Sequence, residues 1–334
     1  MAQGGSRLAV VSALIGNFLV MVAKFIAFAL TGSGAMLSEG IHSIADLLNQ
    51  FLLLIGIVRS GRTADLEYQY GYGSERYVWA LISAVGIFFL GCGFTMYHGV
   101  HSLIHPPATN AGDHLWTAIG VLIFSLVVEG YVLMVAVKAV RQQSGDEPLL
   151  KFMREKADPS VVAVVLEDAA ACLGIVIAMV AIILAHVTGH VWWDAVGSLT
   201  IGVLLGAIAI FLVLRNKELL VGQGVPPHIR AQLLQILRDN PAVEEVVDMR
   251  TRILDSDTYR IKADVRFDGA YLARTMRDKL KAAYPGINSY DDFEHFVIEF
   301  ADDVVELLAE EINEIERQMK HKVPEAQHMD IEAD

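Results

Sequence analysis

Six long apolar stretches fill the first two-thirds of this 334-residue chain. They lie near residues 7–31, 36–58, 77–105, 114–138, 158–187 and 192–214. An α-helix needs about 20 apolar residues to cross the hydrocarbon core of a bilayer, and each stretch reaches that length. With 54% hydrophobic residues overall, the chain is too apolar for an ordinary soluble domain. The sequence therefore predicts an α-helical membrane protein with six transmembrane helices.

Positive charge alternates between the loops that join these stretches. Segments 31–35, 105–114 and 186–191 contain neither Lys nor Arg, whereas the other two loops are basic. Their basic residues are Arg59, Arg62, Arg76, Arg141, Lys151, Arg154 and Lys156. Because Lys and Arg concentrate in cytoplasmic loops, we expect both termini in the cytoplasm. A bacterial inner (plasma) membrane is favoured over an organellar one.

The character of the chain changes after residue 214, where the sequence becomes amphipathic and highly charged. We therefore expect a transmembrane domain at 1–214 and a cytoplasmic domain at 215–334. Apolar periodicity predicts helices and strands in the order α-β-β-α-β, which is typical of a small ferredoxin-like or metallochaperone-like α+β domain. The expected helices are 228–238, 271–283 and 303–322, and the expected strands are 244–253, 258–267 and 328–332.

Cysteine usage and net charge exclude some classes of protein. The only cysteines, Cys92 and Cys172, both fall in predicted spans, so we expect neither a disulfide framework nor a thiolate metal site. The net charge of −13 argues against nucleic acid as a partner.

Four polar residues in the second apolar stretch lie on one face of the expected helix. Glu39, His42, Asp46 and Asn49 follow the spacing i, i+3, i+7, i+10. An ionisable side chain near the bilayer centre costs about 2.5–3.5 kcal/mol by insertion scales. Imidazole and carboxylate together form a ligand set for a divalent transition metal. The alternative is a buried polar seam that joins helices.

The fifth stretch contains two adjacent carboxylates, Glu167 and Asp168, after six apolar residues. Inside a membrane helix they need a counter-charge, protons or a metal, and His42 and Asp46 are their natural partners. The alternative is a helix that begins later and leaves the pair at the membrane interface.

Other polar residues in the spans have two interpretations each. Lys24 and Glu129 can neutralise each other, which we favour, or Glu129 can serve as an outer-shell or proton-relay carboxylate. The third stretch ends with three histidines at the spacing i, i+3, i+7, which are His98, His101 and His105. They form either a metal-binding site on the exit side of the membrane or a polar cap at the membrane interface.

These features together resemble the cation diffusion facilitator family, in particular its branch of mitochondrial-type zinc transporters. The second-span motif of the family appears as residues 38–46 (SEGIHSIAD). The resemblance implies a six-span homodimeric antiporter with a cytoplasmic metallochaperone-like domain. It makes His42, Asp46 and Asp168 ligands of the transported metal. The fourth ligand position holds Val164, and Glu167 is its expected substitute.

The chain also departs from the family pattern. In the second-to-third loop, residues 68–73 read YQYGYG where the family has HPYGHG, so only Asp65 is left of the loop metal site. We expect that site to be absent. Near the end, His328 and Asp330 match a His-x-Asp strand and indicate a weak second metal site.

The resemblance implies efflux of a divalent transition-metal cation, zinc first, by metal/proton antiport with alternating access. A site with three carboxylates and one imidazole also suits manganese or iron. An intramembrane metalloenzyme and a gated channel are the alternatives of a different class. We expect no enzyme activity and no catalytic cofactor. The expected partners are the metal ion, protons, the bilayer and a second copy of the chain. Glu39, Asn49 and Glu129 are expected next to the ligands or along the ion path.

Overall fold

The computed structural model describes residues 2–31, 34–105, 115–145, 148–155, 157, 159–190, 192–255 and 257–334. The backbone divides into two compact units, Met1–Val221 and Gly222–Asp334. The expected boundary at 214–215 falls inside a helix that continues to Val221. Each unit is described by itself.

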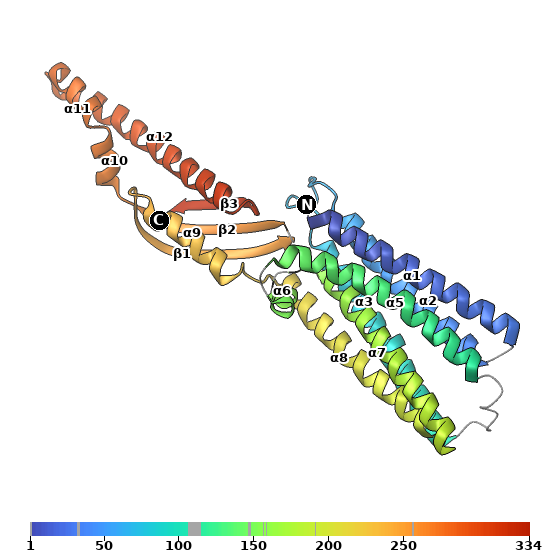
Figure 1. Cartoon of the computed structure of the whole chain (residues 1–334). Coiled ribbons are helices and arrows are strands. Elements are labelled where there is room, and N and C mark those ends of the chain that lie inside the picture. The colour runs from blue at the N-terminus through green and yellow to red at the C-terminus, as the bar shows by residue number, and fades with distance from the viewer. Residues whose placement is uncertain are drawn as a thin grey trace. The chain divides into compact units, whose positions relative to one another are not determined.

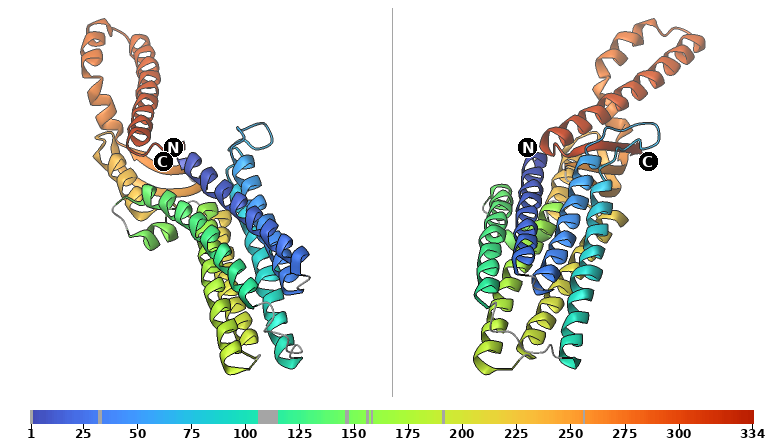
Figure 2. Two further views of the ribbon diagram at one scale, coloured as in Figure 1. Left: turned by 45° about the vertical axis from the view of Figure 1, so that its right-hand side comes forward. Right: turned by 90° about the vertical axis from the view of Figure 1, so that its right-hand side faces the viewer.

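The first unit consists of helices (Figure 1). Its elements are α1 (Ala2–Thr31), α2 (Gly34–Ser60), α3 (Glu75–Gly86), the π-helix η1 (Ile87–Gly93), α4 (Phe94–Ile104), α5 (Leu115–Ser144), α6 (Leu149–Glu155), α7 (Pro159–Thr188) and α8 (Trp192–Val221). Helix α1 packs against α2 and α5, and α7 packs against α5 and α8. Figure 2 shows the long helices of this unit running side by side.

Four helical segments among the described residues are long and apolar enough to cross a membrane. They are Glu75–Ile104, Ile119–Gln142, Ser160–Thr188 and Trp192–Val221. Within α1, the stretch Val10–Ile26 is apolar but shorter. A multi-pass helical membrane unit is therefore present, while the count of six spans stays a prediction.

Helix α8 lies unusually close to the helix formed by α3, η1 and α4. A Cβ atom added at Gly206 would lie 2.9 Å from Cys92 Sγ, and one at Gly202 would lie 2.8 Å from Met96 Sδ. Both distances are too short for an alanine to be accommodated without movement. The small residues of the sixth apolar stretch thus permit a close helix crossing.

The second unit is a three-stranded sheet with helices. Its elements are α9 (Pro227–Asp239), β1 (Val243–Asp255), β2 (Thr258–Phe267), α10 (Gly269–Thr275), α11 (Arg277–Ala283), η2 (Tyr284–Gly286), α12 (Tyr290–Lys322) and β3 (Ala326–Ala333). The order is β1-β2-β3, with β1 antiparallel and β3 parallel to β2. Leu233 and Leu237 of α9 form one core with Ile261 of β2 and with Ile315 and Met319 of α12.

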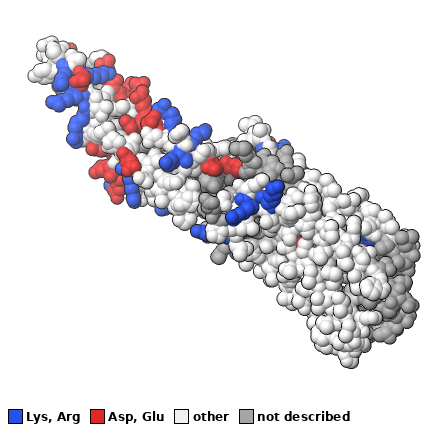
Figure 3. Space-filling view, in the orientation of Figure 1, with Lys and Arg blue, Asp and Glu red and all other residues white. Residues whose placement is uncertain are grey.

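The expected long helix of this unit begins earlier than residue 303. Ser289 caps α12 with a reciprocal pair of bonds: its Oγ accepts from the Asp292 N–H at 3.1 Å, and Asp292 Oδ2 accepts from the Ser289 N–H at 2.9 Å. This capping box fixes the helix start before Tyr290. The expected single helix 271–283 is interrupted at Met276. On the face drawn in Figure 3, Lys, Arg, Asp and Glu side chains are spread over the second unit, whereas the long helices of the first unit show almost none.

Replacing Ile315 by alanine is expected to destabilise the second unit by about 2–5 kcal/mol, because Ile315 is fully buried in its core. Urea unfolding of the detergent-solubilised chain, followed by circular dichroism, measures the change. The matched control is Ile298→Ala on the same helix, where the side chain is 63% exposed. Equal losses in the two variants would contradict the assignment of this core.

Candidate functional site

Carboxylates on three helices of the first unit act on one another electrostatically. Asp168 of α7 is 2% exposed and Glu129 of α5 is 7% exposed. The negative charges of Glu129 and Asp46 act on the Asp168 carboxylate, and those of Asp168 and Asp46 act on Glu167. Asp46 of α2 is thus the common neighbour of the two carboxylates on α7. The structure therefore brings Asp46, Glu129, Glu167 and Asp168 into one electrostatic cluster.

Glu167 is held by two side-chain amides of α2. Gln50 Nε2 donates to Glu167 Oε2 at 2.8 Å, and Asn49 Nδ2 donates to Oε1 at 3.5 Å. Both amide residues are buried. Helix α7 begins at Pro159, so Glu167 lies more than two turns inside it and not at a helix start. Asn49 is thereby a hydrogen-bonding neighbour of a predicted ligand.

Asp168 has an unusual oxygen. Its Oδ2 atom is fully buried and has no hydrogen-bond partner among the described residues. A carboxylate only accepts hydrogen bonds when it is ionised, so such an oxygen needs a proton or a cation. Val164, one turn earlier, is fully buried and offers no polar atom. The orphaned Asp168 oxygen is the feature of this cluster that most directly indicates cation binding.

Two predicted site residues fall outside the described side chains. The backbones of Glu39 and His42 belong to α2, but their side chains lie outside what the structure describes. Where side chains are described, no group of three or more His, Cys, Asp or Glu residues is placed to hold a metal ion. The described part of the cluster is therefore made of carboxylates and amides, without its predicted imidazole.

Lys24 has a partner on α2. Its Nζ atom donates to Ser43 Oγ at 3.0 Å, and both side chains are buried. Ser43 is one turn before Asp46, so Lys24 brings a positive charge to the α1 side of α2. This contact supports a structural role for Lys24 in joining the two helices.

Asp65, the remaining residue of the family's loop site, organises the α2–α3 loop. Its carboxylate accepts hydrogen bonds from Tyr72 Oη at 2.6 Å and from the Tyr68 N–H at 2.8 Å. The Tyr72 hydroxyl is the main cause that holds the pKa of Asp65 below its ordinary value, and the Tyr68 N–H adds to it. The guanidinium of Arg62 lies 4.2 Å from the centre of the Tyr72 ring. Tyrosine in place of histidine thus gives Asp65 a hydrogen-bonding role within the loop.

Two of the three histidines at the end of the third stretch, His101 and His105, stack on each other. The rings of His101 and His105 are 4.9 Å apart, and the Tyr97 ring lies 5.9 Å from that of His101. This aromatic column along α4 fits the interfacial polar cap better than a metal station, which needs converging ring nitrogens.

The predicted second metal site lies on β3 next to basic residues. His328 pairs in register with Arg260, and Asp330 pairs with Lys262. Asp330 Oδ2 is 3.7 Å from Arg260 Nη2. These cations already compensate the Asp330 carboxylate, which weakens the case for a metal at this position.

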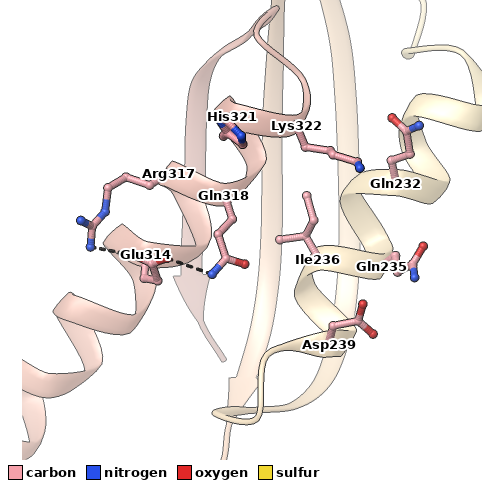
Figure 4. A pocket seen from close by; sticks show the side chains of 9 residues that line it. All are labelled: Gln232, Gln235, Ile236, Asp239, Glu314, Arg317, Gln318, His321 and Lys322. Atoms are coloured by element: carbon pink, nitrogen blue, oxygen red, sulfur yellow. Dashed lines mark hydrogen bonds and ion pairs between the residues drawn. The ribbon is translucent and has the colours of Figure 1, made fainter.

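A groove of about 700 Å³ runs between α9 and α12 in the second unit (Figure 4). Its polar groups are partly satisfied by each other, because Glu314 accepts from Gln318 at 2.9 Å and pairs with Arg317 at 2.8 Å. It is lined by Gln232, Gln235, Ile236, Asp239, Glu314, Arg317, Gln318, His321 and Lys322. The groove holds no cluster of metal ligands among these residues.

Sequence reasoning missed Gln50. Gln50 is one helical turn after Asp46, so the same spacing rule that selected His42 and Asp46 would have selected it. Its contact with Glu167 depends on how α2 and α7 pack, which helical spacing alone does not reveal.

Comparisons with known proteins agree with this picture. A family model described as the cation efflux transmembrane domain matches residues 10–221. The chain is 36% identical over 339 residues to "Proton-coupled zinc antiporter SLC30A9, mitochondrial" of Xenopus laevis, covering 99% of this chain and 60% of that protein. The Homo sapiens protein of the same name is 36% identical over 337 residues, with 99% of this chain and 59% of that protein covered. "Metal tolerance protein C4" of Arabidopsis thaliana is 35% identical over 340 residues, with 98% and 73% covered.

The chain spans about 60% of the length of the first relative.

These relatives settle two expectations. Relatives from Xenopus laevis, Mus musculus, Homo sapiens and Pongo abelii are named mitochondrial, so the expectation of a bacterial inner membrane is wrong. Loop charges report the side of a membrane and not which membrane it is, which explains the error. The expectation that the chain is a transporter and not an enzyme is confirmed.

Proposed function

Because the chain belongs to the cation efflux family, also called the cation diffusion facilitator family, we propose that it moves zinc across a membrane in exchange for protons. The observation that carries this proposal is Asp168 Oδ2, which is buried without a hydrogen-bond partner among the described residues and is acted on by the charges of neighbouring carboxylates. The names of the relatives, which are proton-coupled zinc antiporters, support zinc and protons as the two substrates.

The proposed transport site is made by His42 and Asp46 from α2 and by Glu167 and Asp168 from α7. Helices α2 and α7 contact each other, and Asp46 interacts with both α7 carboxylates. Glu167 still has free lone pairs after accepting two amide hydrogen bonds, since an ionised carboxylate offers about four acceptor positions. Glu39, Asn49 and Glu129 are proposed to support these ligands or to line the path of the ion.

Exchange with protons follows from the chemistry of the ligands. A metal binds to ionised carboxylates and neutral imidazole, so its binding releases protons. When the site opens to the other side, protons arriving at the same atoms displace the metal. Rocking of the helices around the fixed site would give alternating access. The close contact of α8 with η1 and α4 at Gly202 and Gly206 is the kind of small-residue face along which helices can slide.

Zinc is the first proposal and manganese or iron the second. Zinc favours four ligands with nitrogen or sulfur among them, whereas oxygen-rich sites suit harder ions such as manganese. The described cluster is rich in oxygen atoms. A homodimer and an organellar membrane of the mitochondrial kind are further proposals, supported by the family and by the names of the relatives.

Zinc uptake into proteoliposomes tests this function. With the purified chain and an imposed pH gradient, we expect saturable uptake of zinc, and a comparison with manganese, iron, cobalt and cadmium ranks the substrates. Empty liposomes are the control. An uptake rate equal to that of empty liposomes for every one of these ions would refute the proposed function.

A further inference from the structure

Gln50 is one of the most deeply buried polar side chains in the helix bundle. It is 1% exposed, on the turn of α2 that follows Asp46. Its Nε2 atom donates to Glu167 Oε2 at 2.8 Å. Its Oε1 atom is fully buried and has no hydrogen-bond partner among the residues that the structure describes. Leaving a buried acceptor unsatisfied costs about 1–3 kcal/mol.

The orientation of this amide is fixed by its neighbour. Turning the amide over would bring Gln50 Oε1 against the carboxylate oxygen of Glu167, and two acceptors repel each other. Glu167 therefore holds the nitrogen, and the oxygen must point elsewhere. The carbonyl oxygen is thus presented in a defined direction beside the carboxylate cluster.

Two buried oxygens that lack a hydrogen-bond donor among the described residues come from helices that contact each other. Gln50 Oε1 belongs to α2, Asp168 Oδ2 belongs to α7, and Glu167 links the two residues as the partner of Gln50 and the chain neighbour of Asp168. Two acceptors cannot satisfy each other, but a cation between them satisfies both. Side-chain carbonyl oxygens are accepted ligands of divalent ions, especially the harder ones.

We propose that Gln50 Oε1 is a ligand of the transported cation, next to Asp168 Oδ2. This inference rests on the proposed function and adds a neutral oxygen to its site. Gln50 would add a neutral oxygen to the site, which the buried and apolar Val164 of α7 cannot do. The additional oxygen favours cations that accept more than four ligands, so Gln50 is a specificity-determining residue as well.

Exchanging the oxygen of residue 50 for sulfur or carbon tests this ligand. Gln50→Leu removes the donor atom, and Gln50→Met replaces it with a thioether, which prefers soft metals. Neither variant can donate to Glu167, so loss of that hydrogen bond is common to both. Metal affinity of the detergent-purified chain is measured by competition with a fluorescent chelator, using manganese, zinc and cadmium.

We expect both variants to lose affinity for manganese and zinc by about 10-fold or more, as measured for outer-shell changes at metal sites. Cadmium is expected to bind the Gln50→Met variant roughly fivefold more tightly than the Gln50→Leu variant, because sulfur suits a soft ion. Wild-type affinities in Gln50→Leu, or equal cadmium affinities in the two variants, would overturn the proposal. In the second case Gln50 would act only by positioning Glu167.

Asn216 of α8 offers a matched control. It is fully buried, its Nδ2 donates to the Leu212 carbonyl at 2.8 Å, and its Oδ1 lacks a described partner. Asn216→Leu should leave the ratio of cadmium to manganese affinity unchanged. If Gln50→Leu does not fold, the ratio of cadmium to manganese affinity is compared between Gln50→Met and wild type. A higher ratio in Gln50→Met supports Gln50 as a ligand, and an unchanged ratio refutes it. A wild-type chain that binds none of the three metals would refute the proposed function instead.

Discussion

The Asp168→Asn variant is expected to lose at least about 100-fold in kcat/KM for zinc transport. Asp168 Oδ2 is buried and has no hydrogen-bond partner in the described part of the chain, so the substitution removes the charge that most directly requires a cation. Changes one shell farther from a metal already cost 10- to 100-fold, and a direct ligand should cost more. Initial rates of zinc uptake into proteoliposomes with a pH gradient measure the loss. Asparagine has almost the same shape, so the fold should be kept.

Glu167→Gln is the matched control for this prediction, because it makes the same chemical change at the adjacent residue. Both oxygens of Glu167 accept hydrogen bonds from Asn49 and Gln50, and a glutamine oxygen can still accept one of them. We expect a loss of about 10-fold, which is smaller than that of Asp168→Asn. If Asp168→Asn transported zinc like wild type, the assignment of the site would be wrong. If the order of the two losses were reversed, Glu167 would be the principal ligand.

Much of the architecture could be read from the sequence, because membrane helices are specified by the length of their apolar stretches. The helix of the last apolar stretch continues past residue 214 to Val221. Arg215 and Asn216 look like the start of a soluble segment, yet both are buried in α8. Asn216 satisfies its amide nitrogen within the helix by donating to the Leu212 carbonyl. The helix continues until Gly222, whose φ of +115° suits glycine.

The candidate site was only partly predictable. The sequence shows the spacing of His42 and Asp46, which helical periodicity places on one face of α2. It also shows the two adjacent carboxylates of α7. Contacts between helices are not visible in the same way. The hydrogen bond from Gln50 to Glu167 joins residues that are 117 positions apart. Tertiary packing, and not local pattern, decides that a neutral glutamine enters a cluster of carboxylates.

The early start of α12 illustrates the same limit on a smaller scale. Apolar periodicity predicts this helix only from residue 303, and five acidic residues lie in the preceding segment 290–302. A local device, the capping box of Ser289 and Asp292, nucleates the helix instead. The residues of this capping box are visible in the sequence. Apolar periodicity does not select them, because the box is flanked by asparagine and tyrosine.

Collapsing the pH gradient is expected to stop zinc uptake by the wild-type chain. Without a metal, the negative charges of Asp46, Glu129, Glu167 and Asp168 would act on one another within a helix bundle of the membrane type. Charged groups in that environment are costly, so protons must take the place of the departing metal. Nigericin in potassium buffer removes the gradient, and a zinc-sensitive dye inside the vesicles reports the initial rate. We expect a fall of about 10-fold or more.

The reverse coupling gives a second measurement of the same exchange. Without an imposed gradient, adding zinc outside the vesicles should drive protons out, and a pH-sensitive dye inside should report alkalinisation. Asp168→Asn vesicles should show neither signal, which controls for leakage. A gated channel would behave differently, since zinc would then enter down its own gradient at an unchanged rate after nigericin. Zinc uptake that does not depend on the proton gradient would therefore refute antiport as the mechanism, while the assignment of the metal site would still hold.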